Sequence, residues 1–183
     1  MSNLIYLSWD SEFFSKKIGS ITIDGQISKQ YLINTLEQAK TDGYEILYLT
    51  DNSNNLVNNE IITQLNGDLI DEKITYKKTP KKHIDSKRRV INYESQILHN
   101  DLIELAYISG TFSRFKRDTR FTENDFKKLY RKWIERSVQK ELADEVFVYK
   151  DNEEILGFIT IKIQAQQARV GLIAVNPNQQ GKN

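Results

Sequence analysis

Residues 145–175 read EVFVYKDNEEILGFITIKIQAQQARVGLIAV, and this stretch decides the fold class. Apolar and polar side chains alternate in three runs, as they do in strands with one buried face. We expect strands over residues 145–150, 155–163 and 168–175, with a hairpin turn at 151–153 between the first two. The hairpin predicts that the first two of these strands pair antiparallel.

An amphipathic helix is expected just before these strands. Thr122 can cap it, and Asp125 three residues later resembles the second half of a capping box. The helix should run to about Lys140. Its core face is expected to consist of Phe126, Leu129, Tyr130, Trp133, Ile134 and Val138. Upstream of it we expect a strand over 90–98, a helix over 101–108 ended by Gly110, and an irregular basic loop over 111–121.

The first part of the chain has the pattern of a small α/β unit. Its expected elements are strands over 18–24 and 45–50, helices over 28–41 and 58–65, and an extended third strand over 68–77. A basic linker separates this unit from the sheet. We therefore expect an α/β protein of two domains, with residues 1–85 in a small N-terminal α/β domain and residues 86–183 in the second.

Composition narrows the class of protein. Of the 183 residues 39% are hydrophobic and 28% are charged, which indicates a chain with a real core. The sequence has no apolar run of about 18 residues and no signal-like N-terminus, so we expect a cytoplasmic protein. Cysteine is absent, which excludes disulfides and thiolate sites. The net charge of +1 gives no reason to expect nucleic acid or a membrane as a partner.

Residues 73–89 are strongly basic and leave two interpretations open. They contain eight Lys or Arg and one acid, Asp85. One hypothesis is a non-enzymatic module that binds a nucleotide or polyanion through this segment. We favour a solvated connection, because residues 77–89 have no interleaved aromatic for base stacking. His83 and His99 stand in no metal-binding pattern, so no metal is expected.

The most informative residues for chemistry are those at the C-terminal end. The strand expected at 168–175 runs into the polar sequence NPNQQGKN, which contains Gly181. Backbone N–H groups in such a loop can bind a phosphate or pyrophosphate. A plain turn at the end of the strand is the structural alternative.

This stretch, ARVGLIAVNPNQQGKN, resembles the fourth strand and acetyl-CoA loop of the GNAT N-acetyltransferases. In the loop of that family, Q/R-x-x-G-x-G/A, the first four places are taken here by Gln180, Gly181, Lys182 and Asn183, with Asn183 where Gly is usual. The hairpin over 145–163 is similar to the family's second and third strands, with Gly157-Phe158 in the familiar place. The resemblance implies a mixed, mainly antiparallel sheet with helices, truncated at residue 183.

The resemblance implies a role for each part of this stretch. The backbone of Ile173, Ala174 and Val175 would pair with the pantetheine arm of acetyl-CoA, the co-substrate. Amides of residues 180–183 would hold the pyrophosphate, and Lys182 would add charge. No metal takes part in the reaction of the family.

A narrower resemblance is to GNAT members that acetylate nucleotide-linked amino sugars. It rests on the opening W-D-x-x-F-F from Trp9 to Phe14 and on the S-R-F…D loop from Ser113 to Asp118. It implies transfer of an acetyl group to the amine of a dTDP-4-amino-4,6-dideoxyhexose, in polysaccharide biosynthesis. Arg114 and Arg117 would bind the diphosphate, because guanidinium forks suit phosphate oxygens. Phe112, Phe115 or Trp133 would face the thymine or sugar, and core packing is the alternative for each.

The pattern of the family continues past Asn183. We therefore expect this chain to contain the N-terminal half of a GNAT domain, either as part of an acetyltransferase or as an inactive truncated form. The family's general acid, a Tyr after the fifth strand, has no counterpart here, so no catalytic residue is assigned. A sheet that ends at 168–175 leaves an apolar edge, which predicts self-association, for example as a homodimer, or disorder near the C-terminus.

Overall fold

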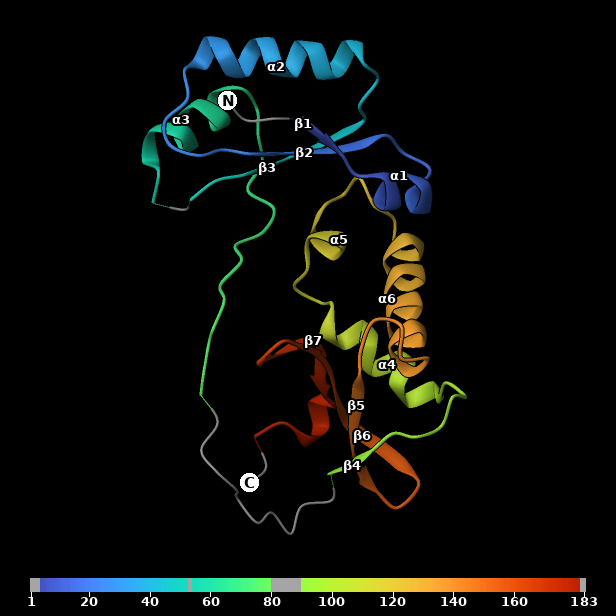
Figure 1. Ribbon diagram of the computed structural model, residues 1–183. Coiled ribbons are helices and arrows are strands. Elements are labelled where there is room, and N and C mark those ends of the chain that lie inside the picture. The colour runs from blue at the N-terminus through green and yellow to red at the C-terminus, as the bar shows by residue number, and fades with distance from the viewer. Residues whose placement is uncertain (1–3, 53, 80–89, 182–183) are drawn as a thin grey trace. The chain divides into compact units, whose positions relative to one another are not determined.

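The computed structural model describes residues 4–52, 54–79 and 90–181. The chain divides into two compact units, unit 1 (residues 1–73) and unit 2 (residues 74–183) (Figure 1). It is an α/β protein, with a mixed three-stranded sheet and helices in unit 1 and a four-stranded antiparallel sheet with helices in unit 2. The expected boundary near residue 85 lies outside the described residues and stays a prediction.

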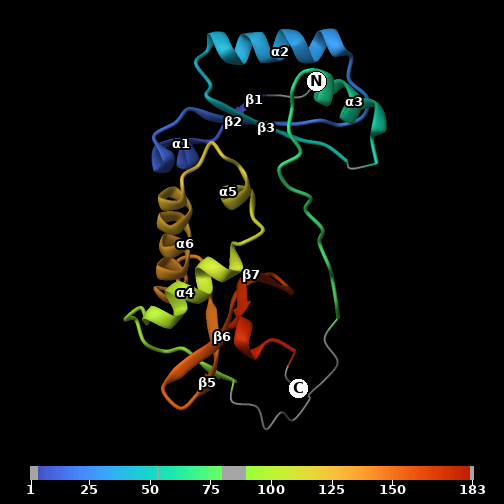
Figure 2. The same cartoon turned by 180° about the vertical axis from the view of Figure 1, so that it is seen from behind.

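Unit 1 is built on a parallel strand pair. Its strands are β1 (Leu4–Tyr6), β2 (Ile18–Thr22) and β3 (Ile46–Thr50), in the order β1-β2-β3. β1 is antiparallel to β2, whereas β3 is parallel to it and needs a long crossover. α2 (Lys29–Thr41) supplies this crossover and runs alongside the sheet in both views (Figures 1 and 2). Two shorter helices complete the unit, α1 (Ser8–Phe14) and α3 (Leu56–Gln64).

A buried amide ties the loops of unit 1 together. Asn58 of α3 is fully buried, and its Nδ2 donates to Gly25 O at 2.8 Å and to Asp51 Oδ2 at 2.7 Å. Its Oδ1 accepts from the Ile27 N–H at 3.0 Å. Every bond that this side chain makes is to the segment before α2 or to the end of β3. The single residue therefore fixes the connections at one end of the sheet.

The third strand of unit 1 is not where the sequence suggested. Residues 68–77 form no strand, and Leu69, Ile74 and Tyr76 are each at least 71% exposed. The third strand is β1, which pairs Leu4 with Ile21. The expectation over 68–77 was wrong because its apolar side chains have no sheet to pack against. The other expected elements of unit 1 are confirmed, including the Ser28 cap of α2, whose Oγ accepts from the Tyr31 N–H.

Unit 2 is an antiparallel sheet in the order β4-β5-β6-β7. Its strands are β4 (Val90–Asn92), β5 (Glu145–Asp151), β6 (Glu154–Gln164) and β7 (Gln167–Val175). Its helices are α4 (Asn100–Ser109), α5 (Arg114–Arg117) and α6 (Glu123–Val138). A short 3-10 turn, η1 (Pro177–Gln179), follows β7.

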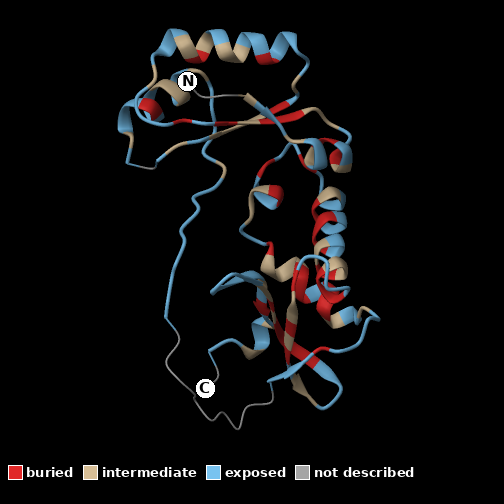
Figure 3. Ribbon diagram, in the orientation of Figure 1, coloured by how far each residue is buried: buried red, intermediate tan, exposed pale blue. Residues whose placement is uncertain are grey.

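One face of this sheet is covered and the other is open. α4 packs against β6 and β7, and α6 packs against β5 and α4. Val146, Val148 and Phe158 lie in this core and are at most 4% exposed (Figure 3). The side chains that alternate with the core positions face outward. We call their side the open face, which carries Tyr149, Ile163, Val170, Ile173 and Val175, each 39–57% exposed.

The helices of unit 2 follow the sequence closely. The Thr122 Oγ1 accepts from the Asp125 N–H at 3.1 Å, and an Asp125 carboxylate oxygen accepts from the Thr122 N–H at 2.9 Å. The capping box is therefore complete. Trp133 is the one residue of the expected core face that is only half-buried. Two details differ, because the strand expected over 90–98 ends at Asn92 and the loop over 111–121 contains the single helical turn α5.

No helix among the described residues is long and apolar enough to cross a membrane.

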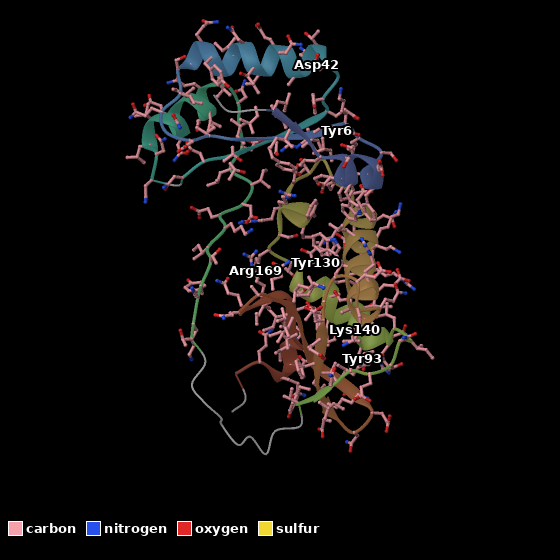
Figure 4. The ribbon with its side chains drawn as sticks, viewed as in Figure 1. Tyr6, Asp42, Tyr93, Tyr130, Lys140 and Arg169 are labelled. Carbon is pink, nitrogen blue, oxygen red and sulfur yellow. The ribbon has the colours of Figure 1, made fainter. Side chains whose placement is uncertain are left out.

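The contact between Gly110 and Tyr130 gives a first test of this packing. A Cβ on Gly110, the C-cap of α4, would lie 2.4 Å from the ring of Tyr130, which is 5% exposed. Tyr130 is labelled in Figure 4. Because neither helix can move freely, Gly110→Ala should destabilise unit 2 by about 2 kcal/mol. Urea unfolding followed by Trp133 fluorescence in a Trp9→Phe background measures it, since the chain has only two tryptophans.

The control for this test is a double-mutant cycle. In a Tyr130→Leu background the ring is gone, so Gly110→Ala should cost much less. An equal cost in both backgrounds would contradict the assigned contact.

Asp144 fastens the start of β5 to the end of β6. Its Oδ2 accepts from the Ile163 N–H at 2.5 Å and its Oδ1 from Lys162 Nζ at 2.9 Å. The backbone bond from Ile163 is the larger cause, and Lys162 the next, that holds the Asp144 pKa below its ordinary value. The ionised carboxylate therefore stabilises the folded state, and this contribution is lost as the pH falls through the folded pKa.

The pH dependence of stability tests this role. At pH 7 Asp144→Asn should lower the free energy of unfolding, and the difference from wild type should shrink as the pH falls below about 4, where unfolded Asp protonates. Unfolding of the Trp9→Phe protein by urea from pH 7 to pH 3 provides the measurement. Lys162→Met keeps the Ile163 bond and should retain most of the pH dependence. Parallel curves for wild type and Asp144→Asn would rule the role out.

Candidate functional site

β7 is the last strand of the sheet, so one of its edges is unpaired by any described strand. On its other edge Phe158 pairs with Ala174 and Gly157 with Val175. Asn176 donates its N–H to Leu156 O at 2.8 Å, which fixes the direction of the neighbouring groups. In an antiparallel strand, successive residues direct their backbone N–H and C=O groups to opposite edges. The backbone groups of Ala174 therefore face β6, as those of Asn176 do, and the backbone groups of Ile173 and Val175 face the free edge.

A β-bulge interrupts β7 just before these residues. Ile159 pairs with Ile173 but Ile161 pairs with Val170, so β7 contains one residue more than the strand beside it. The extra residue lies at Gly171–Leu172, opposite Thr160. The Leu172 N–H donates to Thr160 Oγ1 at 2.8 Å. A Cβ on Gly171 would lie 2.8 Å from the same oxygen, so glycine permits this close approach.

The segment after β7 folds back on the free edge. Asn176 Oδ1 accepts from the Asn178 N–H at 3.0 Å, and the Gln179 N–H donates to Asn176 O at 2.8 Å. Gln180 Nε2 then donates to Val175 O at 3.0 Å, on the outward side of the strand. Gly181 has φ of +71°, a left-handed conformation that favours glycine. We call residues 173–181 the β7 edge site.

The second group of candidate residues lies on α5. Phe115 is buried and packs edge-to-face against Phe121 at 5.4 Å and Trp133 at 5.8 Å. The Arg114 guanidinium lies 4.7 Å from the centre of the Phe115 ring, and Arg117 is exposed. The ring of Phe115 is thus used for packing, whereas Arg114 is half-buried and Arg117 is exposed. Its expected contact with a ligand stays a prediction.

A short ion-pair network holds the α5 turn in place. Lys116 Nζ bonds to Glu123 at the start of α6, and this hydrogen bond is the largest cause that lowers the Glu123 pKa. Asp118 is 2% exposed, and its Oδ1 accepts from Arg120 Nε at 2.7 Å and from the Arg120 N–H at 3.0 Å. The turn therefore combines a cationic surface with a buried carboxylate. On α4, burial raises the pKa of the Tyr107 hydroxyl.

The two groups of candidate residues stay on separate elements. Ile173, Val175, Gln180 and Gly181 are exposed and lie along the free edge of β7. Ala174, between two of them, is buried and directs its backbone groups to β6. Arg114, Phe115 and Arg117 lie on α5, which packs on α6. Lys182 and Asn183 lie outside the described residues, as does most of the basic segment 73–89, so their roles stay predictions.

Sequence reasoning missed Thr160 and underused Asp118. An isolated glycine inside a strand is a signal for a bulge, and Gly171 gave that signal. The sequence shows Asp118 as part of the S-R-F…D motif, and nothing in the sequence indicates that it is buried. His99 has a structural role, because its Nδ1 accepts from the Asp101 N–H as the cap of α4. Within residues 4–52, 54–79 and 90–181 no cluster of His, Asp or Glu could hold a metal ion.

Comparison with known proteins adds no relative. A scan against protein-family models gives no match, and a search of the curated proteins gives none either. The class that the fold itself supports is an α/β protein with a free-edged antiparallel sheet. The resemblance to GNAT acetyltransferases rests on the sequence motifs.

The bulge can be tested with an isosteric pair of variants. Thr160→Val keeps the shape but leaves the Leu172 N–H without an acceptor, which should cost about 1–3 kcal/mol. Thr160→Ser keeps the oxygen and should cost less. Amide exchange of Leu172 by NMR, together with urea unfolding, measures both effects. If Leu172 exchanges equally slowly in both variants, the hydrogen bond is not what holds the bulge.

Proposed function

We propose that this chain belongs to a GNAT-type N-acetyltransferase and binds acetyl-CoA at the β7 edge site. The observation that carries the proposal is the free edge of β7. Directly after a bulge, Ile173 and Val175 direct their backbone N–H and C=O groups to this edge. A pantetheine arm carries two amides in a row and can pair with such an edge as an added strand does. One outward N–H is then placed to polarise the thioester carbonyl.

The loop after β7 supports a phosphate site next to this edge. Gly181 adopts a left-handed φ, and consecutive N–H groups around such a residue form a concave anion site. The 3.4 Å bond from the Gln180 N–H to Pro177 O is long, so exchanging it for a phosphate oxygen costs little. The pyrophosphate of acetyl-CoA would follow its pantetheine arm into this loop.

The proposed acceptor is the amine of a nucleotide-linked amino sugar, a dTDP-4-amino-4,6-dideoxyhexose. The cationic α5 turn, with Arg114 and the exposed Arg117, suits its diphosphate. The neutral amine attacks the thioester carbon, so that a C–N bond forms and the C–S bond breaks. The amine gives up one proton, and the departing thiolate takes one up. No described residue is assigned as the acid or base.

Calorimetry with acetyl-CoA and the full chain tests the proposal. We expect saturable binding by wild type, and about tenfold weaker binding by Val175→Pro, which lacks the outward N–H. Val175 is 40% exposed, and proline is tolerated where the N–H of an edge strand faces away from its neighbour. Val175→Ala is the matched control, because it shortens the side chain but keeps the N–H.

Two parts of the ligand separate the contributions to binding. Binding of acetyl-pantetheine should depend on the strand edge, so Val175→Pro should weaken it. Binding of adenosine 3′,5′-bisphosphate should be unchanged by Val175→Pro. If wild type binds none of the three compounds, the proposed function is wrong.

A further inference from the structure

Two polar side-chain atoms of the α5 turn are buried without a hydrogen-bond partner among the described residues. They are Asp118 Oδ2 and Ser113 Oγ, and Ser113 as a whole is half-buried. Buried polar atoms are nearly always paired, and an unpaired carboxylate oxygen is among the costliest exceptions. Two exceptions within six residues of one turn call for a common physical reason.

The position of Asp118 is fixed by its other oxygen. Oδ1 accepts both bonds from Arg120, one from the backbone N–H and one from Nε. The Asp118 N–H donates to Arg114 O at 2.8 Å, which closes the α5 turn below the carboxylate. The side chain is 1% exposed, whereas the Arg120 side chain is 43% exposed. Oδ2 is therefore a preorganised acceptor for which the described residues supply no donor.

Ser113 is at the N-cap of α5 with φ −73° and ψ 159°. In this conformation a serine usually accepts a hydrogen bond from the first turn with its own oxygen. Here the side chain makes no such bond. Its hydroxyl is thus available to donate to another group.

A ligand hydroxyl satisfies both atoms, because it donates one hydrogen bond and accepts another. A phosphate could not, since its oxygens would face the carboxylate as a second anion. The surface of the same turn is cationic, with Arg114 and Arg117 near these two residues in sequence. A ligand that carries both a hydroxyl and a phosphate therefore fits the turn better than either group alone.

We propose that Ser113 and Asp118 form a hydroxyl-binding subsite, where a sugar hydroxyl of a nucleotide-linked ligand donates to Asp118 Oδ2 and accepts from Ser113 Oγ. The inference rests on the proposed function for its ligand class and assigns the sugar, as distinct from the diphosphate, to these two side chains. Binding requires α5 to open, because both atoms are buried in the free protein. Opening has to move Phe115 away from Phe121 and Trp133 and break the bond between Lys116 and Glu123, so contacts with the ligand must offset this cost.

The test compares dTDP-glucose with dTDP as probes of the full chain by calorimetry. Wild type should bind dTDP-glucose more tightly than dTDP. Asp118→Asn and Ser113→Ala should each weaken the binding of dTDP-glucose by about tenfold, because one hydrogen bond to the sugar is lost. The affinity for dTDP should stay unchanged. The side-chain amide introduced by Asp118→Asn retains an oxygen for Arg120, so the turn keeps its shape.

Ser113→Ala keeps the test decisive if the Asp118 variant unfolds. Removing a buried hydroxyl without a partner should leave the stability of unit 2 unchanged or raised, whereas affinity for the sugar falls. Ser137→Ala is the matched control, because that hydroxyl is buried and donates to Trp133 O at 2.8 Å. It should lose stability and keep the preference for dTDP-glucose.

Three results would overturn the inference. They are no binding of either probe, equal binding of the two probes by wild type, and an equal weakening of both by the variants. The last result would mean that the two side chains only maintain the shape of the turn and do not contact the sugar. Acetyl-CoA binding is measured separately, so failure of the sugar subsite and failure of the proposed acetyltransferase remain distinguishable.

Discussion

The hydrogen bond from the Leu172 N–H to Thr160 Oγ1 decides how unit 2 can use its last strand. It holds the extra residue of the bulge, and this extra residue shifts by one position which side chains of β7 face the core. Without it every residue after Gly171 would turn to the other face of the sheet. Ala174, now 7% exposed against the helices, would face solvent, and Val175 would enter the core. One side-chain oxygen on β6 thereby determines which backbone groups of β7 are presented at the free edge.

The free edge is of use only because the covered face is rigid. α4 and α6 pack against each other and against the sheet, and the complete capping box at Thr122 starts α6 at a defined residue. Asp101 at the start of α4 accepts from the Ile155 N–H of β6 at 2.9 Å, which joins the helix layer to the sheet by a polar bond as well. The cationic α5 turn is held to α6 by Lys116 and Glu123. Both candidate groups are thus positioned by the same pair of helices, although they lie on different elements.

Long periodic segments were predictable from the sequence, and short ones were not. The face of α6 and the three strands from β5 to β7 repeat their pattern often enough to be recognised. β1 has three residues and shows no period, so its pairing with β2 could not be read. Over 68–77 the sequence has strand-like residues but no partner, and tertiary context decided against a strand. The edge site was predictable as a backbone feature, whereas the buried state of Asp118 depends on packing that only the fold reveals.

An exposed strand edge next to an apolar face is a hazard as well as an opportunity, since it can pair with another chain. Gln180 limits this hazard, because its side chain occupies the outward carbonyl of Val175. A side-chain amide is a weak and easily exchanged cover, whereas a second strand would have to displace it in register along the whole edge. A ligand with two amides needs only a short part of that edge. The Gln180 cover on residues 173–181 therefore disfavours continuous strand pairing, and it leaves the short stretch of edge that the proposed acetyl-CoA site needs.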